Sequence, residues 1–404
     1  MFKRELFTEI TPYLDSPEAV VITGMRQVGK TTLLTYIYEQ INSENKLFLD
    51  LENPINRKHF EEENYEKIKF NLERLGVDFS KKAYLFLDEI QLIKNIPSVV
   101  KYLHDHYQIK FFLTGSASFY LKNLFSESLA GRKFIFELFP LNFREFLVFK
   151  GQKLKLPKPT EVSELTFQLF LPLYEEYLTW GGFPGVVLKS SKEAKEKALD
   201  DVFSSYFQKE IIQLGDFRDV NLLRDFILLL AQRVGSKLDI SKIASELGAS
   251  RPTIYEYLAF LEGTYFLKTI KPFSRAKDAE IRSASKVYFC DSGLLNRIAK
   301  LDSGRVFENA IFNALRLGGA VNYYQRKSGV EIDFVLDGAR AFEVKLHASQ
   351  RDLNRLARVA SELKLSEYFL VAKDYSPLPN VVYGWGMAQG LFSKKEASRE
   401  GWGQ

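Results

Sequence analysis

The sequence has little cysteine and no long apolar run, and each absence excludes a class of protein. Cys290 is the only cysteine among 404 residues, so an internal disulfide is impossible and a reducing compartment is expected. No stretch approaches the length of uninterrupted apolar sequence that a membrane-spanning helix needs. The first residues, MFKRELFTEITPYL, carry charges where a signal peptide needs an apolar core. We therefore expect a cytoplasmic protein with no membrane partner.

The sequence also lacks an internal repeat of fixed period and any low-complexity tract. Its composition, 46% hydrophobic and 26% charged residues, is typical of soluble globular domains. A chain of 404 residues exceeds one ordinary hydrophobic core, so several domains are expected. The net charge of +5 permits nucleic-acid binding without requiring it. A segment rich in lysine and proline, GQKLKLPKPTEV at 151–162, marks one boundary between domains.

The strongest local motif lies near the amino terminus, in AVVITGMRQVGKTTLLTYIYEQ. An apolar strand leads into a glycine-rich loop and then into a helical pattern, which is the context that a phosphate-binding P-loop requires. Glycines let backbone N–H groups surround a phosphate chain, and the helix N-terminus adds its positive dipole end. Lys30 would reach the outer phosphates, and the hydroxyl of Thr31 would ligate magnesium. The motif therefore predicts ATP and Mg²⁺ as cofactors.

A second motif, AYLFLDEI at 83–90, is an apolar strand that ends in two acids. Asp88 would hold the magnesium ion, and Glu89 is placed to orient or deprotonate an attacking water. In isolation, such a pair of acids is more often a plain helix cap. Because it follows a P-loop in the same chain, the catalytic interpretation is favoured.

Polar residues also follow two other apolar strands. In FLTGSAS, Thr114 or Ser116 would sense the γ-phosphate, although hydroxyls at strand ends more often form turns. Asp50 and Glu52, after the strand KLFLDLE, would line the same pocket or act as structural caps. The predicted nucleotide-binding residues are Gly24, Met25, Arg26, Gln27, Val28, Gly29, Lys30, Thr31, Thr32, Asp88 and Thr114.

An arginine outside the P-loop is a candidate for stabilising the transition state. Arg132, in SLAGRKFIFEL, would serve as an arginine sensor or finger, since the charge that develops on the phosphates needs a further cation. The alternative is a surface arginine that follows a glycine turn. A homo-oligomer is compatible with the sequence, which leaves open whether Arg132 acts in its own subunit or in a neighbour.

The middle of the chain carries a helix-turn-helix pattern, in LDISKIASELGASRPTIYEYLAFLEGTYFLKTIKPF at 238–273. Two short helices and a hairpin-like tail predict a winged helix. Arg251, Thr253 and Tyr255 would lie near the start of the recognition helix. A basic run suited to DNA phosphates follows it and consists of Lys268, Lys271, Arg275 and Lys277. Winged helices also serve as protein-packing modules, so DNA contact and a packing role both stay open.

The segment GVEIDFVLDGARAFEVKL at 329–346 alternates charged and apolar residues and has a turn signal at its centre. A turn at 337–339 would place Asp333 opposite Glu343, and opposed like charges are destabilising without a compensating group. A divalent cation, with Lys345 beside it, would compensate them. A hairpin whose solvated face happens to be acidic is the alternative.

The elements around this hairpin resemble the αβββαβ order of the restriction-endonuclease core. That core carries an acid on its first helix, an aspartate on its second strand and Glu-x-Lys on its third. Glu308, Asp333 and the pair Glu343 and Lys345 fill these positions. Asp333 and Glu343 would bind a metal ion, and Lys345 would position water or stabilise charge on a phosphate. Metal binding and phosphodiester cleavage are separate expectations, because such a fold can persist without activity.

The order of the motifs resembles one family as a whole. GMRQVGKTTLL, LFLDEIQ, FLTGSAS, LAGRKF, FPLNFREFL and WGGFPGVV follow one another as in bacterial and archaeal AAA-type ATPases that carry a carboxyl-terminal domain of unknown function, DUF4143. The resemblance covers nearly all of the chain. It implies an ASCE-type fold, with a parallel sheet flanked by helices and ATP at the carboxyl ends of the strands. WGGFPGVV is expected to form a turn against the ATPase core.

The expected fold class is α/β, with a P-loop parallel sheet, a helical region and winged helix, and a restriction-endonuclease-like domain. The expected domains are 1–150, 151–233, 234–283 and 284–404. The expected function is a Mg²⁺-dependent ATPase coupled to a DNA-associated half. The alternative is an ATP-driven regulatory switch that gates a protein partner and has an inactive nuclease-like fold.

Overall fold

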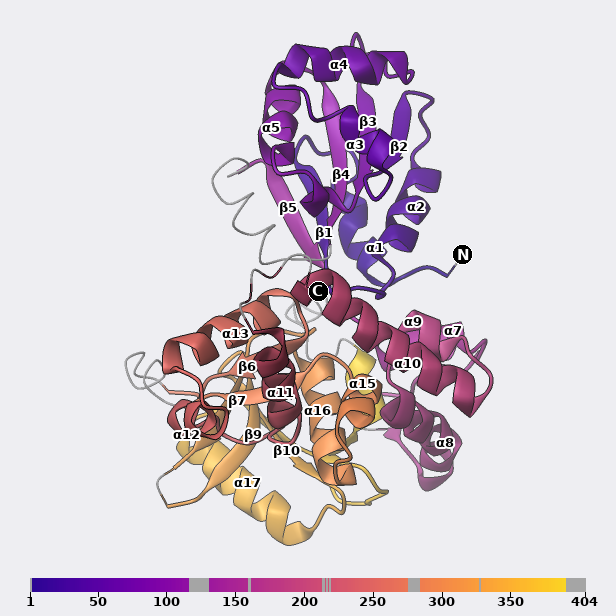
Figure 1. Ribbon diagram of the computed structural model, residues 1–404. Helices are drawn as coiled ribbons and strands as arrows, with labels where there is room; N and C mark the ends of the chain where they lie inside the picture. Colours follow the sequence, from indigo (N-terminus) through magenta and orange to yellow (C-terminus); the bar gives the residue numbers. More distant parts are fainter. Residues whose placement is uncertain are drawn as a thin grey trace. The chain divides into compact units, whose positions relative to one another are not determined.

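The computed structural model describes residues 2–115, 131–158, 161–212, 215, 217, 219–274, 284–326 and 328–389. The chain divides into two compact units, which are described separately below (Figure 1). The first unit comprises Met1–Phe139 and Gly263–Tyr265, and the second comprises Pro140–Glu262 and Phe266–Gln404. The segment after Phe139 thus belongs to the second unit, and the expected boundary at residue 150 stays a prediction. The expected three-part division of the remaining chain stays a prediction.

The first unit is built on a parallel sheet whose strand order, among the described residues, is β2-β3-β4-β1-β5. Its strands are β1 (Ala19–Thr23), β2 (Lys46–Asp50), β3 (Ala83–Asp88), β4 (Ile109–Gly115) and β5 (Lys133–Glu137). Its helices are α1 (Leu6–Ile10), η1 (Thr11–Tyr13), α2 (Lys30–Gln40), α3 (Pro54–Lys58), α4 (Tyr65–Arg74), η2 (Ile90–Leu92) and α5 (Ile96–His106).

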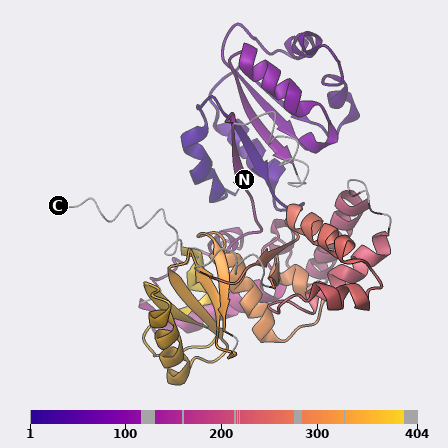
Figure 2. The same cartoon turned by 90° about the vertical axis from the view of Figure 1, so that its left-hand side faces the viewer.

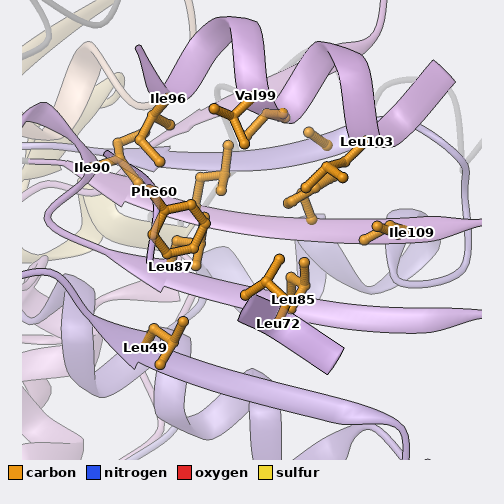
Figure 3. Packing of buried hydrophobic residues seen from close by; sticks show 14 of the residues in the cluster. Leu49, Phe60, Leu72, Leu85, Leu87, Ile90, Ile96, Val99, Leu103 and Ile109 are labelled. Carbon is orange, nitrogen blue, oxygen red and sulfur yellow. The ribbon is translucent and has the colours of Figure 1, made fainter. Parts of the chain in front are cut away.

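Side chains pack against both faces of this sheet, because successive residues of β3 point to opposite faces. Leu85 and Leu87 pack with residues of α5 such as Leu103 in one apolar core (Figure 3). Phe86, between them, faces the other side, where its ring stacks on Phe112 at a centroid distance of 4.7 Å. A strand that is buried on both faces needs a continuous apolar run, and this is the pattern that the sequence carries before Asp88.

The second unit begins with helices and continues with a strand pair and a mixed sheet. Its helices are α7 (Phe143–Phe149), α8 (Glu164–Trp180), α9 (Pro184–Val187), α10 (Lys192–Tyr206), η4 (Phe207–Ile212), α11 (Val220–Ala231), α12 (Ile240–Glu246), α13 (Arg251–Gly263), α15 (Ser292–Ile298), α16 (Ser303–Leu315), α17 (Gln350–Glu362) and η5 (Gly384–Gln389). Its strands are β6 (Leu267–Ile270), β7 (Lys286–Phe289), β8 (Val321–Gln325), β9 (Glu331–Leu336), β10 (Arg340–Lys345), β11 (Glu367–Ala372) and β12 (Val381–Tyr383).

The two sheets of the second unit follow the element order that the sequence predicts. β6 and β7 pair antiparallel after α12 and α13, as a helix-turn-helix followed by a hairpin requires. The larger sheet has the order β12-β11-β10-β9-β8 among the described residues, with β8, β9 and β10 antiparallel and β10, β11 and β12 parallel. Figure 2 shows α17 along one face of this sheet. The α/β fold class is therefore confirmed.

The contacts given below for the glycine pair in WGGFPGVV lie within the second unit, and a turn against the ATPase core stays a prediction. The backbone N–H of Gly182 donates to Oδ2 of Asp291 at 2.7 Å, and its carbonyl oxygen accepts from the N–H of Leu141 at 2.7 Å. A Cβ at Gly182 would overlap the carbonyl oxygen of Leu141. The motif is therefore explained by a close backbone approach next to a buried carboxylate.

Candidate functional site

The P-loop connects β1 to α2, and its backbone conformation depends on its glycines. Gly24 has φ +152° and Gly29 has φ +97°, values that side-chain-bearing residues rarely adopt. A Cβ at Gly24 would also overlap the carbonyl oxygen of Leu138. Gln27 adopts φ +62° at the tip of the loop. The side chains of Met25 and Val28 are buried, so only their backbone groups face a nucleotide.

Lys30 begins α2 and lies at the centre of the loop. Its ammonium group donates to the carbonyl oxygens of Gly24 at 3.0 Å and Met25 at 2.9 Å, and the side chain is buried. The first N–H groups of a helix have no partner within the helix, and the helix dipole is positive at this end. Thr31 and Thr32 follow in the first turn and are exposed. Lys30 and the backbone donors of this helix start are thus close together, and their binding of phosphate stays a prediction.

Asp88 lies at the carboxyl end of β3, and one strand, β4, separates β3 from the P-loop strand β1. Its carboxylate accepts a hydrogen bond from the hydroxyl of Thr114 at the end of β4, and the hydroxyl of Thr31 also contacts it. Burial raises the pKa of Asp88, whereas these two hydroxyl groups lower it. A carboxylate beside the P-loop hydroxyl is an oxygen donor pair that suits Mg²⁺, which keeps several of its waters and completes its shell with phosphate oxygens. The residues present thus fit a magnesium ion.

Glu89 follows Asp88 and occupies a strained position. Its φ of +55° is uncommon for a residue with a side chain, and its backbone N–H donates to Oγ1 of Thr114 at 3.3 Å. Its carboxylate accepts a hydrogen bond from the side-chain amide of Gln91. Glu89 is therefore held beside the predicted magnesium ligand by one backbone contact and one side-chain contact. Gln91 is a positioning residue that the sequence analysis missed.

The acids after β2 lie at the same edge of the sheet. Asp50 is the register partner of Asp88 in the parallel pair of β2 and β3. Oδ1 of Asp50 accepts the backbone N–H of Glu52 at 2.8 Å, and Glu52 forms an ion pair with Arg26 of the P-loop at 3.8 Å. Asp50 thus caps a turn, as one predicted alternative has it, and its place in a nucleotide pocket stays a prediction.

Arg132 does not lie at this edge of the sheet. It precedes β5, and its carbonyl oxygen accepts the N–H of Ala19 at the amino end of β1. Its Nε donates to Oδ1 of Asp105 at 2.9 Å. Since β1 and β5 run parallel, Arg132 lies at the opposite end of the sheet from Lys30, and a finger that acts on nucleotide held by the same chain does not fit this placement. The other sensor candidate, Ser116, lies outside the described residues.

A second cluster of ionisable residues lies within the second unit, around the hairpin of β9 and β10. Phe342 pairs with Phe334, and Asp333 and Glu343 are the next residues of β9 and β10 beyond this pair. Oδ2 of Asp333 accepts the backbone N–H of Val344 at 2.7 Å. Burial raises the pKa of Asp333, whereas the nearby charges of lysines lower it.

Glu343 is buried and paired with two cations. Nζ of Lys345 lies 2.9 Å from its Oε1, and the guanidinium group of Arg355 on α17 donates to the same oxygen. Burial, together with the charge of Asp333, raises the pKa of Glu343 to about 7, although Lys345 and Arg355 oppose this shift. The carboxylate is therefore already compensated by residues of the chain itself.

Glu308 joins the cluster from α16. Its carboxylate accepts the hydroxyl of Tyr288 at 2.7 Å, and burial followed by the charge of Asp333 raises its pKa to about 7. Lys286, on the same face of β7 as Tyr288, is buried and forms an ion pair with Glu331. In the part of the chain that the structure describes, no three His, Cys, Asp or Glu side chains converge closely enough to hold a metal ion. The cluster as it stands is an ion-pair network, and metal binding by Asp333 and Glu343 stays a prediction.

The sequence analysis missed Lys286, Tyr288 and Arg355. The alternation in KVYF places Lys286 and Tyr288 on one face of a strand, but their partners are distant in the chain. Arg355 lies on a helix with several other charged residues and is distinguished from them only by its contact with Glu343. Only the folded structure brings these residues together.

The structure describes most of the residues that the sequence assigns to a helix-turn-helix and its basic run. Arg251 and Tyr255 are exposed at the start of α13, and Tyr255 is 59% exposed. Thr253 completes the helix cap, because its hydroxyl lies 2.8 Å from Oγ of Ser250. Of the basic run, Lys268 and Lys271 are exposed, whereas two further predicted residues lie outside the described part of the chain, namely Arg275 and Lys277.

Within the described residues, no helix is both long enough and apolar enough to span a membrane.

Two family models match parts of the chain. Residues 16–147 match a model described as an AAA domain, and residues 171–305 match a domain of unknown function, DUF8612. The first match covers the P-loop and the two acids after β3, which supports the AAA-type part of the resemblance. The second match is to a different domain from DUF4143, so that part of the resemblance is not confirmed.

Curated relatives extend over most of the chain. The uncharacterized protein MJ1544 of Methanocaldococcus jannaschii is 29% identical over 378 residues, which cover 88% of this chain and 82% of the relative. An uncharacterized protein of Haemophilus influenzae is 28% identical over 350 residues, or 83% of this chain and 84% of the relative.

Solved structures with partial similarity include two archaeal proteins of Aeropyrum pernix. ORC1 in complex with DNA aligns with a TM-score of 0.34 at 12% identity, over 73% of this chain and 91% of that chain. ORC2 in its ADP form aligns with a TM-score of 0.36 at 14% identity, over 65% of this chain and 84% of that chain. These scores are too low to carry an argument about function. Through residues 16–147 the chain is nevertheless similar to AAA domains.

Proposed function

We propose that this protein is a Mg²⁺-dependent ATPase. The observation that carries the proposal is the convergence of Lys30, Asp88 and Glu89 at the carboxyl edge of one parallel sheet, with hydroxyl groups on both sides of Asp88. Ligands of open parallel sheets bind at this edge. The match of residues 16–147 to an AAA domain supports the same class.

In this proposal ATP is hydrolysed by in-line attack of water on the γ-phosphate, and residues of the P-loop and of the end of β3 have separate roles. Backbone N–H groups between Gly24 and Lys30 hold the phosphates, and Lys30 turns from its carbonyl partners toward the outer phosphates. Glu89 orients the attacking water and accepts its proton. Thr31 and Asp88 would hold Mg²⁺, which neutralises charge on the phosphate oxygens when it is bound.

We propose further that the second unit associates with DNA through α13 and the β6–β7 hairpin. Arg251 and Tyr255 are exposed at the start of α13, and Lys268 is exposed on β6. Glu262 accepts the backbone N–H of Thr269 at 2.7 Å and lies 3.7 Å from Nζ of Lys268, so its charge offsets part of the charge of that lysine. Exposed cations beside a helix start are suited to phosphate contacts.

A second candidate function is a regulatory switch that gates a protein partner and has an inactive nuclease-like fold. The observation that favours it is the closure of the second cluster on itself, since Glu343 is paired with Lys345 and Arg355, and Glu331 with Lys286. Wild type and Lys345→Ala, incubated with branched or single-stranded DNA and Mg²⁺ or Mn²⁺, test this. Cleavage by wild type alone would reject the switch, whereas equal cleavage points to a contaminant.

The experiment that tests the main proposal is the ATPase rate of wild type and Glu89→Gln, with and without duplex, branched and single-stranded DNA. A rate in the wild type that DNA stimulates and that the variant lacks supports an ATPase coupled to DNA. A rate that no form of DNA changes leaves the ATPase and rejects the coupling. An equal rate in both proteins rejects the assignment of Glu89.

A further inference from the structure

One short segment of the chain belongs to the first unit although its neighbours on both sides belong to the second. This segment is Gly263–Tyr265, between α13 and β6. Tyr265 adopts φ +62°, which is an outlier for a bulky residue, and its side chain is only 7% exposed. Such a conformation persists only where the surrounding contacts impose it.

The contacts of Tyr265 lie at the base of the P-loop. Its hydroxyl is 2.7 Å from Oγ1 of Thr23 and 2.8 Å from Oε1 of Glu137. Its ring packs edge-on against Phe139 at a centroid distance of 6.0 Å. Because the hydroxyl donates to the Glu137 carboxylate, it accepts from the hydroxyl of Thr23. The tyrosine therefore joins the ends of two strands of the nucleotide-binding sheet.

These strand ends form one wall of the P-loop. Thr23 is the last residue of β1, and Gly24, the first glycine of the loop, follows it directly. The carbonyl oxygen of Thr23 accepts the N–H of Leu138 at 2.7 Å, and Leu138 in turn lies against Gly24 so closely that a Cβ there would overlap its carbonyl oxygen. Thr23 is therefore the residue through which a change in the loop would reach Tyr265.

We propose that Tyr265 is a positioning residue that ties the conformation of the P-loop to α13 and β6. The inference rests on the proposed ATPase function. Since Gly263–Tyr265 is continuous with α13 at one end and with β6 at the other, a change in the bond to Thr23 passes through the peptide chain to both elements. The nucleotide at the P-loop thereby biases the two elements assigned to DNA contact, and by linkage their ligand biases the nucleotide.

Hydrogen exchange of the full chain, with and without a non-hydrolysable ATP analogue and Mg²⁺, tests the proposal. In wild type we expect the analogue to protect the P-loop amides and also to change exchange in α13 and β6. In Tyr265→Phe, which keeps the ring and removes the hydroxyl, P-loop protection is retained and the response of α13 and β6 is lost. We also expect kcat to fall roughly tenfold with KM changed less than about threefold, as the loss of a hydrogen bond to a charged group predicts.

The control is Tyr257→Phe, which removes the hydroxyl of another buried tyrosine, one that lies in α13 itself. Its hydroxyl donates to the carbonyl oxygen of Asp219 at 3.0 Å, within the second unit. This variant should respond to the analogue as wild type does. An unchanged response of α13 and β6 in Tyr265→Phe would overturn the inference, whereas absent P-loop protection in wild type would overturn the ATPase proposal instead.

A double-mutant cycle separates the bond to Thr23 from the bond to Glu137. Thr23→Val keeps the shape of the side chain and removes its hydroxyl. If the two hydroxyl groups act together, the effects of Thr23→Val and Tyr265→Phe on kcat will not add in the double variant. Additive effects would contradict a coupling through this bond.

Discussion

The ammonium group of Lys30 lies 3.0 Å from the carbonyl oxygen of Gly24, so the lysine that should bind phosphate is bonded to its own loop. A bound phosphate chain competes for this ammonium group, because charge-assisted hydrogen bonds are stronger than those to neutral carbonyls. The P-loop therefore has an internal partner for Lys30 that nucleotide can replace.

Lys30→Ala is expected to abolish ATP hydrolysis and to weaken nucleotide binding strongly. The loop loses the side-chain cation that the proposal assigns to the outer phosphates, while its glycine-dependent backbone is retained. The measurements are the steady-state ATPase rate and the affinity for a fluorescent ATP analogue. Lys46→Ala is the matched control, since Lys46 also donates to backbone carbonyls, those of Tyr38 and Ile41. Unchanged ATPase activity in Lys30→Ala would reject the P-loop assignment.

Glu89→Gln should bind ATP as wild type does and hydrolyse it at least about a hundredfold more slowly, in line with the usual contribution of a general base. The amide keeps the size of the side chain and removes the proton acceptor. Single-turnover hydrolysis beside equilibrium binding separates the two effects. The neighbouring Gln91→Met removes only the group that holds Glu89, so we expect a smaller loss there. An equal or larger loss in Gln91→Met would contradict the assigned roles.

The second cluster should give the protein a measurable dependence of stability on pH. The folded pKa of Glu343 is raised to about 7 from an ordinary value of 4.5, so the native state holds a proton that the unfolded chain releases. The free energy of unfolding therefore falls as pH rises from the ordinary pKa to the raised one. Glu343→Gln should flatten this fall by on the order of 1–3 kcal/mol, as measured by urea unfolding between pH 5 and pH 8.

Glu66→Gln, in the first unit, is the control for the direction in which stability changes with pH. Hydroxyl groups of Tyr102 and Tyr107 donate to Glu66 at 2.6 Å and 2.8 Å and lower its pKa. Glu66 therefore stabilises the fold at pH values above the ordinary glutamate pKa, and this stabilisation is lost as the pH falls through the lowered pKa. Glu66→Gln should thus change the free energy of unfolding only at the acidic end of the pH range. A steeper fall with rising pH in Glu343→Gln than in wild type would show that the sign argued for Glu343 is wrong.

Much of the nucleotide site could be predicted from the sequence because its determinants are local. The residues that follow β1, β3 and β4 meet at one edge whenever these strands are parallel, and Lys30, Asp88 and Thr114 are such residues. The same rule explains why Arg132 does not fit a role on nucleotide held by its own chain, since a residue that precedes a parallel strand lies at the opposite edge. Tyr265 could not be found in this way, because its partner Thr23 is 242 residues distant and no pattern joins them.

If the second unit binds duplex DNA, affinity should fall steeply with salt, and single cation deletions should reduce the slope. We expect Arg251→Ala and Lys268→Ala each to lower the salt slope by about one phosphate contact. Fluorescence anisotropy with labelled duplex at several salt concentrations measures this. Arg224→Ala, an exposed arginine on α11 outside the proposed surface, is the control and should leave the slope unchanged. No binding even at low salt would reject the DNA proposal.

The final prediction concerns the glycine motif of the second unit. Gly182→Ala should destabilise the protein by about 2–4 kcal/mol, since the added Cβ would overlap the backbone oxygen of Leu141 and disturb the bond to the buried Asp291. Gly185→Ala, three residues further on in α9, meets no atom within 4 Å and should be neutral or stabilise by up to about 1 kcal/mol. Urea unfolding of both variants decides. If Gly182→Ala and Gly185→Ala were equally stable, the close approach of Leu141 to Gly182 would not explain the glycine there. The steric overlap is what distinguishes Gly182 from Gly185.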